Sequence, residues 1–160
     1  NGAITTTQTI FNKAVAVAAS TRYAYELNFA ISNTAATAKT LQYAIAGTAT
    51  LAAHDYEAIV VAATTVTTPT APTMMQNRIT SGFATLVTIS ANTGAAASTF
   101  TCRVRGTFDI LAGGQGTINF QFGLTAVGTA VTVVAGSSAQ VWPLGTISAI
   151  TNDTSIGNWT

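Results

Sequence analysis

The residues of this chain that could carry acid–base or metal chemistry gather around its single histidine, in the stretch His54-Asp55-Tyr56-Glu57. His54, Asp55 and Glu57 could contribute metal ligands, although a usable metal site generally takes three or four ligands with a supporting second shell. Asp55 and Glu57 would share one face of an extended strand, which could assemble the carboxylate pair of a glycoside hydrolase. His54 would have to be the base of any hydrolytic triad, and no nucleophile elbow accompanies it. We therefore favour a polar loop end here, and we expect no catalytic residue, no metal ion and no cofactor.

The glycine-rich stretch GGQG at 113–116 is the one place that could be mistaken for a phosphate cradle. It lacks the lysine and the Ser/Thr of a P-loop, and the pattern after it predicts a strand rather than a helix. Its glycines are typical of a chain reversal.

Two arginines, Arg103 and Arg105, project from the polar face of their expected strand, alongside Asp109. They could bind a carboxylated sugar or an acidic residue of a partner subunit. The alternative is a surface ladder in which they pair with Glu57 or Asp55 of a neighbouring strand. We favour the ladder, followed by pairing between subunits.

The two tryptophans are candidates for contact with a partner. Trp142 precedes Pro143 near a strand end, and Trp159 lies next to the end of the chain. Either could anchor a subunit, pack in the core or form a stacking platform for a sugar. The single cysteine, Cys102, falls on the apolar face of its strand, which predicts a buried and inert thiol.

Alternation of apolar and polar residues in the stretch 99–124, on either side of the glycine-rich loop at 112–116, organises the rest of the chain. A period of two indicates strands with one buried face, and two such strands around a short glycine loop predict an antiparallel hairpin. Further expected strands are 22–31 with 41–47 as a second hairpin-like pair, 130–135 with 139–144 as a third pair, 56–62 and 79–90, with extended chain at 14–19. We expect a loop at 48–55. Two prolines among threonines at 63–73 predict an extended excursion over the surface or onto a neighbouring subunit.

These segments amount to about eight or nine strands at roughly ten-residue spacing, with no convincing helix, which is typical of an antiparallel sandwich or barrel. We predict an all-β protein, a jelly-roll-like β-sandwich that forms a single domain over residues 1–160. Residues 1–19 are a candidate N-terminal arm or attachment strand. An immunoglobulin fold fits less well, because paired cysteines are absent and the strands are numerous.

The low content of charged residues indicates which partners the chain is expected to have. Only 7% of the residues are charged, against about 25% in typical globular proteins, so we expect part of the surface to be buried against other copies of the chain. A formal net charge of +1 does not indicate binding to nucleic acid or to an acidic membrane surface. The apolar runs are short, so we expect no segment that spans a bilayer.

A resemblance to a known family rests on residues 100–145, FTCRVRGTFDILAGGQGTINFQFGLTAVGTAVTVVAGSSAQVWPLG. The stretches STRYAYELNFAIS at 20–32 and AIAGTAT at 44–50, and the terminal Gly157-Asn158-Trp159, add to it. These motifs resemble a β-rich module of tailed-bacteriophage virion structural proteins. The resemblance implies a non-enzymatic component on the surface of the virion, usually a homotrimer. Such a component is either a capsid decoration (cement) knob or the terminal domain of a head or tail fibre.

The partners implied are other copies of the chain and other virion proteins such as the major capsid protein. The threonine-rich segment with Ile4, Ile10 and Phe11 is the best candidate for an arm that adds strands to a partner. Arg103, Arg105, Trp142 and Trp159 complete the expected contact residues. The alternative function is a fibre tip that recognises host cell-surface glycan through Trp, Tyr and Arg side chains.

Overall fold

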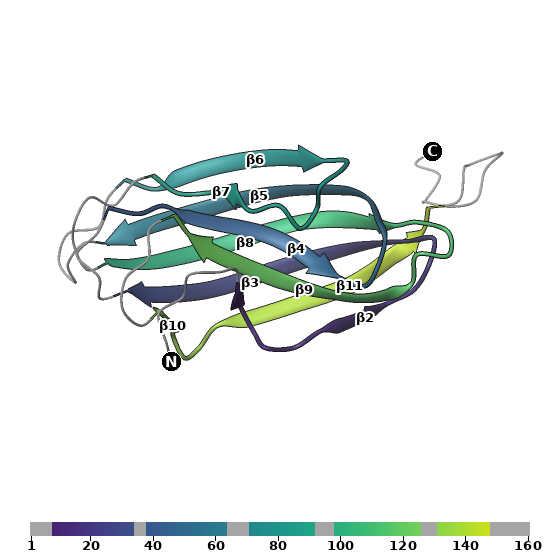
Figure 1. Ribbon diagram of the computed structural model, residues 1–160, viewed down its shortest axis with the longest axis horizontal. Helices are drawn as coiled ribbons and strands as arrows, with labels where there is room; N and C mark the ends of the chain where they lie inside the picture. The colour runs from purple at the N-terminus through teal and green to yellow at the C-terminus, as the bar shows by residue number, and fades with distance from the viewer. Residues whose placement is uncertain (1–7, 34–37, 64–70, 92–97, 126–130, 148–160) are drawn as a thin grey trace, which may run out of the picture.

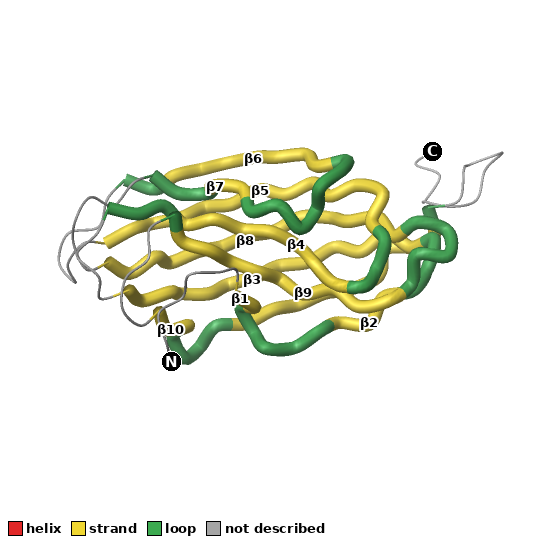
Figure 2. Tube along the Cα trace, viewed as in Figure 1, coloured by secondary structure: helices red, strands yellow, loops and turns green. Residues whose placement is uncertain are grey.

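The structure is a computed structural model that describes residues 8–33, 38–63, 71–91, 98–125 and 131–147 of the chain. In this part of the chain every regular element is a strand (Figure 2), and no helix long and apolar enough to cross a membrane occurs there. The strands are β1 (Gln8–Thr9), β2 (Val15–Val17), β3 (Thr21–Asn33), β4 (Leu41–Gly47), β5 (Leu51–Ala63), β6 (Thr73–Ile79), β7 (Val87–Thr88), β8 (Ser98–Ile110), β9 (Gly116–Leu124), β10 (Val131–Val133) and β11 (Ser138–Thr146).

These strands form two antiparallel sheets that lie one over the other (Figure 1). In the first sheet, β1 and β2 lie along one edge of β9, and β4 and β7 follow on its other side. In the second sheet, β10 and β11 lie end to end along one edge of β3, followed by β8, β5 and β6. The predicted all-β sandwich is therefore confirmed.

Alternation of side chains along the strands builds the core between the two sheets. On β8 the even-numbered Phe100, Cys102 and Val104 are buried, whereas the odd-numbered Arg103 and Arg105 are exposed. Inward residues of β3 and β5 join them from the second sheet, and inward residues of β4 and β9 meet them from the first. Because successive side chains of a strand point to opposite faces, this alternation also fixes which residues reach the outer surfaces.

The predicted hairpins are wrong, although their strands exist. β8 and β9 belong to different sheets, so residues 111–115 carry the chain from one layer of the sandwich to the other. Gly113, with φ of +73°, turns the chain in this connection. β3 and β4 are likewise in different sheets, and β10 and β11 pair with β3 rather than with each other. An apolar stripe of period two is the same for a hairpin and for two strands that face each other across a sandwich, so the pattern alone does not distinguish them.

Two boundaries also differ from the sequence prediction. β5 begins at Leu51 and includes most of the expected loop, because a register shift between Leu51 and Ala53 breaks the alternation there. The expected strand at 79–90 is divided between the end of β6 and β7, and β6 pairs with β5. Of the expected excursion at 63–73, residues 64–70 lie outside the described residues.

The described part of the candidate N-terminal arm belongs to this chain's own first sheet. Gln8 pairs with Phe122 and Val15 pairs with Ile118, both on β9. Ile10 is only 4% exposed and lies in the core, and Phe11 packs against that core. These residues thus stabilise the sandwich itself. Residues 1–7, with Ile4, lie outside the described residues, and for them the arm stays a prediction.

Candidate functional site

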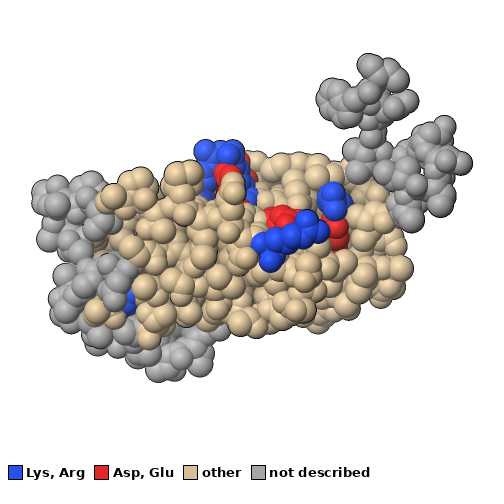
Figure 3. Space-filling view, turned by 90° about the horizontal axis from the view of Figure 1, so that it is seen from above, with Lys and Arg blue, Asp and Glu red and all other residues tan. Residues whose placement is uncertain are grey.

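The charged residues of this chain concentrate on the outer face of the second sheet. All four arginines and four of the five acidic residues lie there, on β3, β5, β6 and β8. They are Arg22, Arg78, Arg103, Arg105, Glu26, Asp55, Glu57 and Asp109. In the view of Figure 3, basic and acidic side chains gather in mixed groups, and most of the surrounding surface is uncharged.

These side chains form cross-strand ion pairs. Arg22 binds both carboxylate oxygens of Asp109, at 2.6 and 2.7 Å. Arg105 pairs with Glu57, which confirms the ladder predicted between β8 and β5. The other pairs are Arg103 with Glu26 at 3.0 Å and Arg78 with Asp55 at 3.7 Å. The sequence prediction offered Arg103 only the acids of β5, but its partner lies on β3, which borders β8 on its other side.

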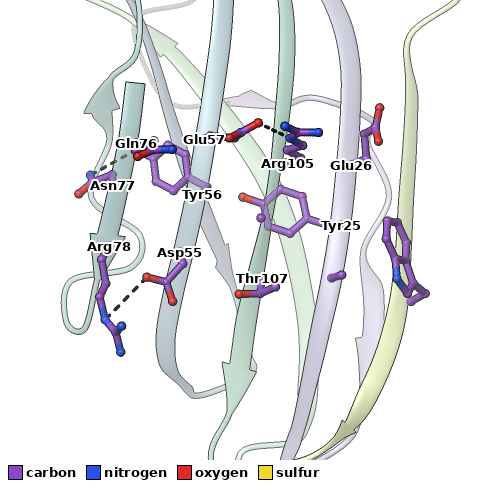
Figure 4. A pocket seen from close by; sticks show the side chains of 13 residues that line it. Tyr25, Glu26, Asp55, Tyr56, Glu57, Gln76, Asn77, Arg78, Arg105 and Thr107 are labelled. Atoms are coloured by element: carbon purple, nitrogen blue, oxygen red, sulfur yellow. Dashed lines mark hydrogen bonds and ion pairs between the residues drawn. The ribbon is translucent and has the colours of Figure 1, made fainter. Parts of the chain in front are cut away.

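A groove of about 780 Å³ opens among these pairs and crosses the outer face from β11 to β6 (Figure 4). The strand register explains the hollow. One row of outward residues runs, strand by strand, through Trp142, Ala24, Thr107, Asp55 and Arg78. The small side chains of Ala24 and Thr107 therefore lie between large side chains at the two ends of the row. They form the low floor of the groove.

Trp142 forms the β11 end of this groove and is 41% exposed. β11 is an edge strand, and its pairing with β3 is irregular directly after Pro143. Of the three roles expected for Trp142, core packing is wrong, whereas anchor and stacking platform both fit an exposed indole. Trp159, its expected counterpart, lies outside the described residues.

The polar groups of the groove come from neighbouring strands and nearly balance in charge. Three carboxylates, Glu26, Asp55 and Glu57, share the lining with the guanidinium groups of Arg78 and Arg105. In Figure 4 Glu57 points toward Arg105 and Asp55 toward Arg78. A hydrogen bond from Asn28 and another from Arg103 lower the pKa of Glu26, so this carboxylate is ionised at neutral pH.

The histidine lies on the opposite side of the sheet from these carboxylates. His54 is 0% exposed and sits in the sandwich core, where its Nε2 lies 2.8 Å from the hydroxyl of Tyr25. The rings of Tyr43 and Tyr56 pack around it. Burial lowers the pKa of His54 to about 3, so the imidazole is neutral at physiological pH. The expected polar loop end is wrong here, because His54 lies inside a strand and points inward.

This orientation separates the three side chains on which a metal or hydrolytic site would depend. Asp55 and Glu57 face solvent while His54 faces the core, because adjacent residues of a strand point to opposite faces. The described residues contain no group of three or more His, Cys, Asp and Glu side chains that could hold a metal ion.

Cys102 is buried as predicted, and burial raises the pKa of its thiol, which keeps it protonated.

A buried aromatic cluster, which the sequence did not predict, consists of Tyr25, Tyr43, His54 and Tyr56. Within it, His54 Nδ1 and the Tyr43 hydroxyl are buried without a hydrogen-bond partner among the described residues. The alternation that places Tyr25 on an apolar face was visible, but the inward position of His54 was hidden by the irregular start of β5.

Comparison with known proteins identifies no relative. No protein-family model, curated protein sequence or solved structure matches this chain. The resemblance to a phage virion module is therefore still a prediction from the sequence.

Proposed function

We propose that this chain is a non-enzymatic structural protein of a tailed-phage virion, a homotrimeric β-sandwich knob that decorates or cements the capsid. One observation carries the proposal. Away from the outer face of the second sheet, Lys13 is the only exposed charged side chain among the described residues, because Lys39 is buried. A surface so poor in charge suits burial against other subunits, since the cores of protein interfaces are depleted in charged residues.

The outer face of the first sheet is the best candidate for that buried surface. Its outward residues on β4 and β9 are uncharged. Gln42, Thr117, Asn119 and Gln121 are half-buried, whereas Ala44 and Gly123 are buried. Amide and hydroxyl side chains of this kind can form hydrogen bonds across an interface without the cost of desolvating an ion.

The strand order gives independent support at the level of the fold. One sheet runs β2-β9-β4-β7 and the other runs β3-β8-β5-β6. From β2 to β9, every connection except β5 to β6 passes from one sheet to the other. We propose on this basis that the sandwich is a jelly roll, with β10 and β11 added beside β3. Jelly rolls occur in viral capsid proteins and in lectins, and the fold alone does not choose between them.

The experiment that tests the structural role introduces a charge into the proposed interface. Gln121→Lys places a cation in the middle of the first sheet's outer face, and Thr101→Lys does the same on the outer face of the second sheet as a matched control. We expect Gln121→Lys to dissociate the oligomer and to abolish co-sedimentation with tailed-phage heads, and Thr101→Lys to do neither. Equal behaviour of the two variants would contradict this assignment of the interface.

A second candidate function is recognition of a cell-surface glycan by a fibre tip. The groove favours it, because an exposed indole and several hydrogen-bonding side chains converge there. A glycan array that shows no binding across cell-envelope sugars would contradict this candidate.

A further inference from the structure

We infer that the groove between Trp142 and Arg78 on the outer face of the second sheet binds a neutral, hydroxyl-rich saccharide, with the Trp142 indole as its stacking platform. This inference rests on the second proposed function, glycan recognition, and it names the site and the ligand class.

The shape of the groove suits an elongated ligand lying across the strands. Its volume of about 780 Å³ lies within the range of roughly 300–1,000 Å³ that is typical of small-molecule sites. The low floor is made by Ala24 and Thr107, and the exposed indole of Trp142 stands at one end. A sugar ring that lies on this floor can therefore place its apolar C–H face against the indole.

The polar groups of the groove keep hydrogen-bonding capacity that a saccharide could use. Asp55 and Arg78 are 3.7 Å apart, which is longer than a hydrogen bond, and both side chains are exposed. A carboxylate offers about four acceptor positions and a guanidinium group about five donors, so even the closer pair of Arg105 and Glu57 retains free positions. Hydroxyl groups both donate and accept, and they match this mixture of side chains.

The charges favour a neutral ligand over an ion. Three carboxylates line the groove, so a phosphate or an acidic sugar would be repelled, whereas Arg78 and Arg105 oppose a cation. A nucleic acid could also stack on Trp142, but its phosphates would meet the same three carboxylates.

The proposed assembly leaves this groove accessible. The charge-poor surfaces are the ones expected to be buried between subunits, whereas the groove lies on the face that carries all four arginines. A trimer built through the first sheet would present its grooves outward.

The test measures binding of defined oligosaccharides to the full chain by calorimetry and by saturation-transfer NMR. The probes are maltotetraose, cellotetraose, mannotetraose and tetra-N-acetylchitotetraose, with sialyllactose and a single-stranded oligonucleotide as charged comparisons. Trp142→Ala removes the platform and Ala24→Met fills the floor. Leu144→Ala is the matched control, because Leu144 is an exposed apolar residue of the same strand outside the groove. Circular dichroism and thermal unfolding verify that each variant is folded.

We expect binding of at least one neutral tetrasaccharide, weakened about tenfold or more by Trp142→Ala and by Ala24→Met and unchanged by Leu144→Ala. Binding that both groove variants leave intact would overturn the site and keep the glycan function. Binding of no neutral probe, or of the charged probes only, would overturn both the site and the glycan function. The structural role is tested separately by Gln121→Lys and Thr101→Lys.

Discussion

The buried histidine makes the stability of this protein depend on pH in a defined direction. Burial lowers the pKa of His54 from 6.5 to about 3 in the folded chain. Below pH 6.5 the unfolded chain binds a proton that the folded chain does not, so acid favours unfolding. The contribution of His54 is fully present above pH 6.5, and it is lost progressively as the pH falls toward 3.

The magnitude follows from the size of the shift. One pH unit within this window changes the free energy of unfolding by about 1.4 kcal/mol, so the folded state loses about 2 kcal/mol between pH 6.5 and pH 5. The complete loss by pH 3 is about 5 kcal/mol, which is comparable to the whole stability of a small domain.

Urea unfolding, followed by circular dichroism at pH 7.5, 6.0 and 5.0 and at one fixed protein concentration, measures this effect. The comparison protein is the double variant Tyr25→Phe/His54→Phe, which removes the titrating ring together with the hydroxyl that lies 2.8 Å from it. A double change is needed because a buried Tyr25 hydroxyl without a partner would itself cost about 1–3 kcal/mol. We expect the wild type to lose about 2 kcal/mol more than the variant from pH 7.5 to pH 5.0.

Subtracting the pH-dependent change in the variant's free energy of unfolding removes the contribution of the surface carboxylates, because these titrate in both proteins. Equal pH dependence of the two proteins would refute the reasoning. So would an NMR titration of His54 in the folded chain with a midpoint above pH 6.

Three further predictions concern stability and reactivity. Arg22→Gln should lower the free energy of unfolding by about 1–2 kcal/mol, because it breaks a two-pronged pair with a mostly buried carboxylate. Arg78→Gln, at the long and exposed pair with Asp55, should change it by less than about 0.5 kcal/mol in the same urea titration, and equal losses would contradict this ranking. Gly106→Ala should lower the free energy of unfolding by about 2 kcal/mol or more, because the new Cβ would lie 2.2 Å from the Asp55 carbonyl oxygen. Gly113→Ala should lower it by only about 1 kcal/mol, because its Cβ meets no atom within 4 Å and only the positive φ is unfavourable. Thermal unfolding measures both variants. Cys102 should react with a thiol reagent only after unfolding, and fast labelling of the native chain would contradict its burial.

The sequence predicted the strands well where the alternation is uninterrupted. β3, β8 and β9 each show a buried face of apolar residues at every second position, and their faces were assigned correctly. This succeeded because the period of two is a local property of an extended chain. The start of β5 was lost because a polar side chain, His54, occupies an inward position next to a register shift.

The pairing of strands could not be predicted in the same way. Strands that follow one another in the chain were expected to pair, yet β8 and β9 pack across the core from each other. The sandwich buries the same apolar stripes that a hairpin would bury, so the energetic difference lies in contacts between distant segments.

The groove could not be predicted either, because it depends on which strands pair and in which register. Ala24 and Thr107 make a floor only because β3 and β8 are neighbours in a particular register, and Trp142 reaches the same row because β11 pairs with β3. Trp142 and Arg105 were predicted as contact residues from the sequence, but only the strand order brings them to one groove.

The solution mass of the isolated chain, measured by light scattering behind a sizing column, tests the central proposal most directly. The proposed virion knob predicts three times the 16.3 kDa protomer, persisting on dilution. A stable monomer would contradict the proposal that the uncharged surface of this sandwich is buried between subunits.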